Sequence, residues 1–99
     1  MDNYKILIVD DEPDILEILK YNLEKENYEV AVANNGEEGL AIATAVDPDL
    51  IILDIMMPKM DGVELCRTLR TKPQFSQTLI AFLTAREEDY SHIAALDVG

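Results

Sequence analysis

The stretch Leu50–Asp54 (LIILD) decides the fold. It is a continuous run of four apolar residues that stops at a carboxylate, Asp54. Uninterrupted hydrophobicity is typical of a parallel strand that is covered on both faces. A loop over residues 55–61 follows, and residues 62–70 have the apolar spacing of a helix. A buried strand that leads into a helix is the repeating unit of a parallel α/β sheet, so we expect this strand to lie inside such a sheet.

The same alternation of short apolar runs and helical spacing extends in both directions from this strand. Pro13 suits the first turn of a helix, and residues 34–36 (NNG) have the composition of a turn. The order of elements, βαβαβαβα, predicts an α/β fold with a doubly wound parallel sheet, right-handed crossovers and helices on both faces. The other predicted strands cover residues 5–9, 28–33 and 79–83, and the other predicted helices cover residues 13–23, 37–46 and 86–97.

Length and composition limit the class of protein. A chain of 99 residues, 48% of them apolar, fits one globular domain with one core. It contains no run of about 18 apolar residues, and its acidic start is unlike a signal peptide, so no membrane span or secretion is expected. The single cysteine, Cys66, offers neither a disulfide nor a pair of metal ligands. These features favour a cytoplasmic protein.

The net charge of −12, from 20 acidic and 8 basic residues, narrows the class of partner. Nucleic-acid binding needs a basic surface, so the charge argues against direct contact with DNA or RNA. It also argues against binding to an anionic membrane surface, whereas it permits cation binding.

Polar side chains follow three of the predicted strands at the point where each strand ends. Asp10 and Asp11 follow the first strand, Asp54 ends the third, and Thr84 follows the fourth. Sites in open parallel sheets form beyond the carboxyl ends of the strands. If the first and third strands are neighbours, three carboxylates meet there and repel one another unless a cation intervenes. A hard divalent cation with oxygen ligands, Mg²⁺ above all, is the expected occupant.

This arrangement makes Asp54 a candidate nucleophile. A carboxylate can accept a phosphoryl group to form a mixed anhydride, and a metal ion offsets the charge of the oxygens involved. The Thr84 hydroxyl could donate a hydrogen bond to that phosphoryl group.

Each of these residues also has a simpler interpretation. Asp10, Asp11 or Glu12 could cap the first helix, Asp54 could start a turn, and Thr84 could cap the last helix. Their coincidence at the ends of three different strands favours a site. The chain lacks the glycine-rich phosphate loops GxGxxG and GxxxxGK[ST]. Met57, in the loop after the third strand, is interpreted as a packing residue.

Three segments resemble the receiver domains of two-component response regulators. They are residues 6–12 (ILIVDDE), residues 48–62 (PDLIILDIMMPKMDG) and residues 83–85 (LTA). The resemblance covers the whole chain and is most specific in the middle segment. It implies a flavodoxin-like sheet of order 2-1-3-4-5, and phosphorylation by a partner histidine kinase.

The resemblance also implies roles for individual residues. Asp54 would be the phosphoacceptor, and Asp11, Asp54 and the Met56 carbonyl would ligate Mg²⁺, with Asp10 acting largely through water. Thr84 would contact the phosphoryl group and Ala85 would leave room for it. Gly62 would shape the loop, because a side chain there would crowd its turn.

The chain departs from the family pattern at its end. The family carries a lysine after a fifth strand, and none of the five lysines here follows one. We therefore expect residues 1–99 to form a single receiver domain that is incomplete at its C-terminus, with strand order 2-1-3-4 and without the fifth strand and helix. The strand at 79–83 would then be a sheet edge, through which the chain could dimerise or associate.

The predicted function is a phosphoacceptor switch rather than an enzyme. The predicted last helix resembles that of regulators with a winged-helix domain, so DNA binding is expected through a domain outside this chain. The alternative is a receiver-like interaction module that takes no phosphate. A metal-dependent phosphohydrolase is disfavoured because Asp10 and Asp11 are adjacent, whereas that class needs an Asp-x-Asp spacing.

Overall fold

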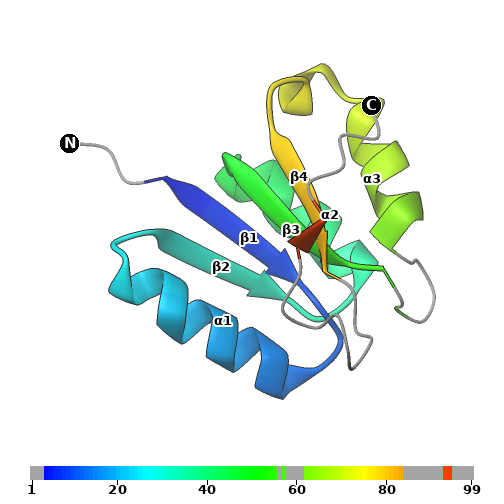
Figure 1. The fold of residues 1–99 in the computed structure, drawn as a ribbon. Helices are drawn as coiled ribbons and strands as arrows, with labels where there is room; N and C mark the ends of the chain where they lie inside the picture. Colours follow the sequence, from blue (N-terminus) through cyan, green and yellow to red (C-terminus); the bar gives the residue numbers. More distant parts are fainter. Residues whose placement is uncertain (1–3, 56, 58–61, 84–92, 95–99) are drawn as a thin grey trace.

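The computed structural model describes residues 4–55, 57, 62–83 and 93–94, and Figure 1 shows their arrangement. The strands form one sheet of order β2-β1-β3-β4-β5. Strands β1 to β4 are parallel to one another, and β5 runs antiparallel to β4. The predicted strand order 2-1-3-4 is confirmed. The elements are β1 (Lys5–Val9), α1 (Pro13–Lys25), β2 (Glu29–Ala33), α2 (Gly36–Val46), β3 (Leu50–Asp54), α3 (Gly62–Arg70), the 3-10 helix η1 (Pro73–Phe75), β4 (Leu79–Leu83) and β5 (Ile93–Ala94).

Helices cover both faces of the sheet (Figure 1). Because side chains alternate along a strand, neighbouring residues of β1 enter different cores. Leu7 and Val9 pack in one core with Leu65 of α3 and Ala43 of α2. Ile6 and Ile8 pack in the other core, which includes Leu16 of α1. This confirms the doubly wound fold and explains the continuous hydrophobicity of β3.

The register of the sheet brings the strand ends together. Val9 lies opposite Leu53 of β3 and opposite Ala33 of β2. The residues that follow these positions, Asp10 and Asp54, therefore lie at the same edge of adjacent strands. The sheet thus places the acids that the sequence predicted to be neighbours.

The predicted helix over 86–97 is wrong at Ile93 and Ala94, which form β5. Leu83 pairs with Ile93 and Phe82 pairs with Ala94. An unpaired strand edge is a template for another segment, and a short apolar segment does not distinguish helix from strand by periodicity. We expected β4 to be a bare sheet edge. Its C-terminal end is instead paired with β5. Association through β4 stays a prediction.

Within the described ranges, no helix is both long enough and apolar enough to cross a bilayer.

Candidate functional site

Three carboxylates meet at the carboxyl end of β1 and β3. One carboxylate oxygen from each of Asp10, Asp11 and Asp54 lies within 4.8 Å of the other two. Asp10 and Asp54 are only 3% and 4% exposed, whereas Asp11 is exposed to solvent. The cluster therefore has a buried floor of two acids and an open side at Asp11. The structure brings together the three acids that the sequence singled out.

The backbone on both sides holds Asp10 in place. Its N–H donates to the carbonyl of Ala33 at 3.1 Å, which ties the end of β1 to the end of β2. Its carboxylate oxygen Oδ1 accepts a hydrogen bond from the N–H of Glu12 at 2.8 Å. Sequence reasoning missed this second bond, although an Asp whose side chain accepts from the backbone two residues later is a common turn.

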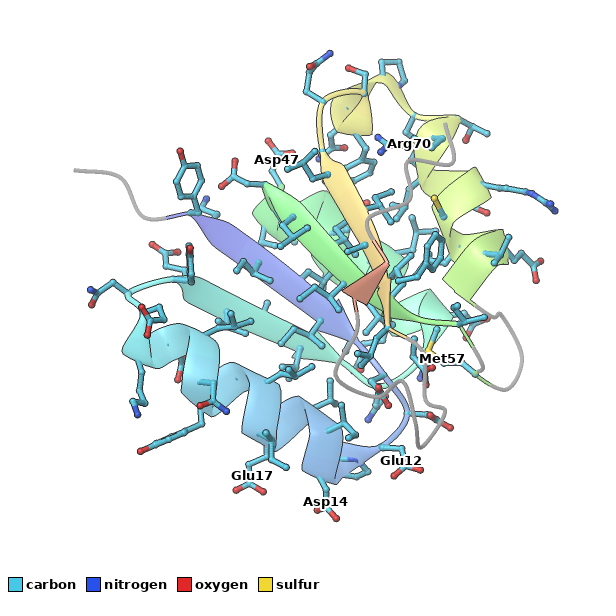
Figure 2. The ribbon with its side chains drawn as sticks, viewed as in Figure 1. Glu12, Asp14, Glu17, Asp47, Met57 and Arg70 are labelled. Carbon is cyan, nitrogen blue, oxygen red and sulfur yellow. The ribbon has the colours of Figure 1, made fainter. Side chains whose placement is uncertain are left out.

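These contacts separate the site interpretation of Asp10 from the capping interpretation. The residue at the N-cap of α1 is Glu12, whose side chain makes no capping hydrogen bond. Asp10 accepts from the N-cap residue itself and not from the amides of the first helical turn, where a capping side chain binds. Figure 2 shows Glu12 between β1 and α1, at the same edge of the sheet as Met57.

The surroundings of Asp10 disfavour its charged form. Burial raises the pKa of the Asp10 carboxyl above its ordinary value of 3.8, and the charges of Asp11 and Glu12 raise it further. The hydrogen bonds from the Glu12 amide and with the Asp54 side chain act in the opposite direction on this pKa. A nearby cation would favour the ionised form. The site therefore holds an excess of negative charge that a divalent ion would offset.

The donor set fits Mg²⁺. All three side chains offer carboxylate oxygens, which are the ligands that hard divalent cations prefer. The open side at Asp11 leaves space for the water molecules that Mg²⁺ retains.

Gly62, the first residue of α3, lies very close to the backbone of Asp54. The N–H of Gly62 donates to the carbonyl of Ile55 at 3.2 Å, and the N–H of Ile55 donates to the carbonyl of Leu83 at 3.4 Å. A Cβ on Gly62 would overlap the Asp54 carbonyl oxygen and would lie 3.0 Å from its carbonyl carbon. This confirms that a side chain at Gly62 would crowd the turn.

Other predicted site residues fall differently. Met57 is buried in the core with Leu65 and Phe82, as expected of a packing residue. Met56, Thr84 and Ala85 lie outside the described residues, so their roles stay predictions.

Comparisons with known proteins agree with the fold. The family model described as the response regulator receiver domain matches residues 6–99. The alkaline phosphatase synthesis transcriptional regulatory protein PhoP of Bacillus subtilis (strain 168) is 45% identical over 97 residues, which are 98% of this chain and 40% of that protein. The transcriptional regulatory protein ResD of the same strain is 43% identical over 95 residues, 96% of this chain and 38% of that protein.

Solved structures give the same result. The crystal structure of response regulator protein TrrA from Thermotoga maritima, in complex with Mg(2+)-BeF, superposes with a TM-score of 0.77. It is 43% identical, and the match covers 89% of this chain and 75% of that chain. This chain spans about two fifths of the length of the curated relatives it matches. The family match shows that the chain belongs to the response regulator receiver domain family, and the two cores and the acid cluster are consistent with it.

Proposed function

We propose that this chain is the phosphoacceptor switch of a two-component system and that it receives a phosphoryl group on Asp54 from a partner histidine kinase. The observation that carries the proposal is the approach of three carboxylate oxygens to within 4.8 Å. Asp10, Asp11 and Asp54 would hold Mg²⁺, with the Met56 carbonyl as a further ligand. When bound, the ion offsets charge on the carboxylate and phosphoryl oxygens.

In the proposed reaction, an oxygen of the Asp54 carboxylate forms a bond to phosphorus. The bond between phosphorus and the imidazole nitrogen of the kinase breaks, and its electron pair stays on that nitrogen. The product is a mixed anhydride on Asp54. Asp54 is suited to this role because it ends β3, which lies between β1 and β4, and because it pairs directly with Leu83 of β4. Thr84 would donate a hydrogen bond to the transferred group and Ala85 would leave room for it.

The relatives support control of transcription as the output of the switch. PhoP and ResD are named as transcriptional regulatory proteins, and this chain matches two fifths of each. We propose that DNA binding in the parent protein resides outside the matched part, because the net charge of −12 is unsuited to nucleic acid. We also propose a cytoplasmic location. The Mg(2+)-BeF complex of TrrA supports Mg²⁺ as the cofactor.

Mass measurement after incubation with a small phosphodonor, such as acetyl phosphate, and Mg²⁺ tests the proposal. The unmodified chain should gain one phosphoryl group, and Asp54→Asn should gain none. The matched control is Asp14→Asn, which removes an exposed carboxylate from the first turn of α1 and should be labelled like the unmodified chain. Labelling of Asp54→Asn would show that another residue is the acceptor. No labelling of any variant would favour an interaction module that takes no phosphate.

A further inference from the structure

The start of α1 lacks the side-chain cap that usually fixes where a helix begins. Its N-cap residue, Glu12, has extended backbone angles, φ −102° and ψ 110°, and makes no capping hydrogen bond with its side chain. The carbonyl of Glu12 already accepts the first helical bond, from the N–H of Leu16 at 3.2 Å. Pro13 occupies the first helical position. The feature that fixes the helix start here is therefore the proline.

A proline restricts the residue before it. The proline ring disfavours helical backbone angles at that residue, so Pro13 holds Glu12 in the extended region. In this conformation the N–H of Glu12 reaches Oδ1 of Asp10 at 2.8 Å. A helical Glu12 would turn its N–H along the helix axis and would release Asp10.

The same restriction protects Asp11. If α1 began one residue earlier, Asp11 would become the N-cap, a position that aspartate strongly favours. Its carboxylate would then be drawn to the amides of the first helical turn and away from Asp10 and Asp54. Pro13 opposes this register in two ways, because it keeps Glu12 out of the helix and has no N–H to offer a capping carboxylate.

We propose that Pro13 is a positioning residue for the acid cluster: it stops α1 from growing backwards and so keeps the carboxylates of Asp10 and Asp11 directed at the cation site. This inference rests on the proposed Mg²⁺ function of the cluster. It adds a residue that touches neither the ion nor the phosphoryl group and acts through the backbone, by restricting Glu12 and by lacking an N–H of its own.

The chain contains a matched control for this proline. Lys72 precedes Pro73 with φ −105° and ψ 125°, is also an N-cap without a side-chain bond, and also places its proline at the first position of the following helix. The helix that begins at Pro73 is η1, and it contributes no residue to the cluster of Asp10, Asp11 and Asp54. Pro73→Ala therefore reproduces the chemical change of Pro13→Ala at a place where no carboxylate depends on it.

The experiment compares Pro13→Ala, Pro73→Ala and the unmodified chain by Mg²⁺ titration and backbone NMR. Relief of a proline restriction changes a conformational equilibrium by a factor of about two to five, so Pro13→Ala should bind Mg²⁺ about two- to fivefold more weakly. Pro73→Ala should bind like the unmodified chain. In the absence of metal, the amide proton of Glu12 should resonate downfield in the unmodified chain, as expected for a bond to a carboxylate. It should move upfield in Pro13→Ala alone.

The two readouts separate failure of this inference from failure of the proposed function. A normal Glu12 amide signal or a normal Mg²⁺ affinity in Pro13→Ala would overturn the positioning role. Equal weakening in Pro73→Ala would also overturn it, because the effect would then be a general loss of rigidity. Absence of Mg²⁺ binding by the unmodified chain would overturn the proposed function, and the inference with it. The metal-free amide signal does not depend on Mg²⁺ and reports the Glu12–Asp10 bond directly.

Discussion

Two aspartates mark the limits of β3 in opposite surroundings: Asp49 immediately precedes the strand and Asp54 ends it. At the amino end, exposed Asp49 joins the starts of three strands: its Oδ2 accepts from the N–H of Lys5 at 2.9 Å, and its own N–H donates to the Lys5 carbonyl at 2.8 Å. Its carbonyl accepts from the N–H of Leu79 at 3.0 Å. At the carboxyl end, Asp54 is buried beside two further acids.

This difference separates a structural aspartate from a functional one. The Asp49 carboxylate stabilises the fold, because it accepts a hydrogen bond from the Lys5 N–H while it remains exposed to water. At the carboxyl end, burial and the charges of Asp11 and Glu12 both disfavour the charged form of Asp10, so this acid opposes folding until a cation arrives. Functional sites commonly carry such a local cost in stability.

The largest effect should come from crowding the carboxyl end. Gly62→Ala places a methyl group against the Asp54 carbonyl, and backbone cannot move aside as a side chain can. We expect the free energy of unfolding to fall by about 3 kcal/mol, at the upper end of overpacking costs. Urea unfolding measures this loss. The control is Gly39→Ala, whose new methyl group would meet the Val9 side chain at 2.9 Å. An equal loss in Gly39→Ala would show that the backbone contact at Gly62 is not special.

At the amino end, loss of the carboxylate should be destabilising. Asp49→Ala removes the acceptor of the Lys5 N–H, and water can replace it because the site is exposed. We expect a loss of about 1 kcal/mol in the free energy of unfolding. The loss should be the same with and without Mg²⁺. A gain in stability would remove the contrast between the two ends of the sheet.

At the carboxyl end, loss of a carboxylate charge should have the opposite sign and a smaller size. Asp10→Asn keeps an acceptor for the Glu12 N–H but removes a buried charge, so the metal-free chain should gain roughly 0.5 kcal/mol, the scale of a modest substitution. Unfolding in the presence of a chelator measures this gain. A loss of stability in Asp10→Asn would mean that the ionised cluster is not costly in the absence of metal.

The effect of Asp10→Asn should depend on pH. The pKa of Asp10 is raised by folding, so the protonated carboxyl stabilises the fold below its ordinary value of 3.8. That stabilisation is lost as the pH rises through the raised pKa of the folded chain. The gain from Asp10→Asn should therefore be small near pH 4 and should grow toward neutral pH. A gain that is constant between these limits would contradict the assignment.

The sequence predicted the bounds of a strand or helix correctly where the apolar pattern of that segment was sufficient to determine its structure. β1, α3 and β4 have the predicted bounds because each is a clear apolar run or helical period. The meeting of Asp10 and Asp54 was also predictable, since parallel strands end at the same edge.

Contacts between distant segments were not predictable. The pairing of Ile93 and Ala94 with β4 depends on the edge that β4 offers, and the bridge from Asp49 to Lys5 depends on residues 44 positions apart. The bond from the Glu12 N–H to the Asp10 carboxylate is local, but only helix capping and cation binding were considered for Asp10.

The most direct test of the central claim is the effect of Mg²⁺ on unfolding of three chains: unmodified, Asp49→Ala and Asp54→Asn. A cation that binds only the folded chain raises its free energy of unfolding by about 2.7 kcal/mol at a concentration 100 times the dissociation constant. We predict this gain for the unmodified chain and for Asp49→Ala, and loss of most of it in Asp54→Asn. Equal stabilisation of all three chains by Mg²⁺, or of none, would contradict the claim that Asp10, Asp11 and Asp54 form a Mg²⁺ site.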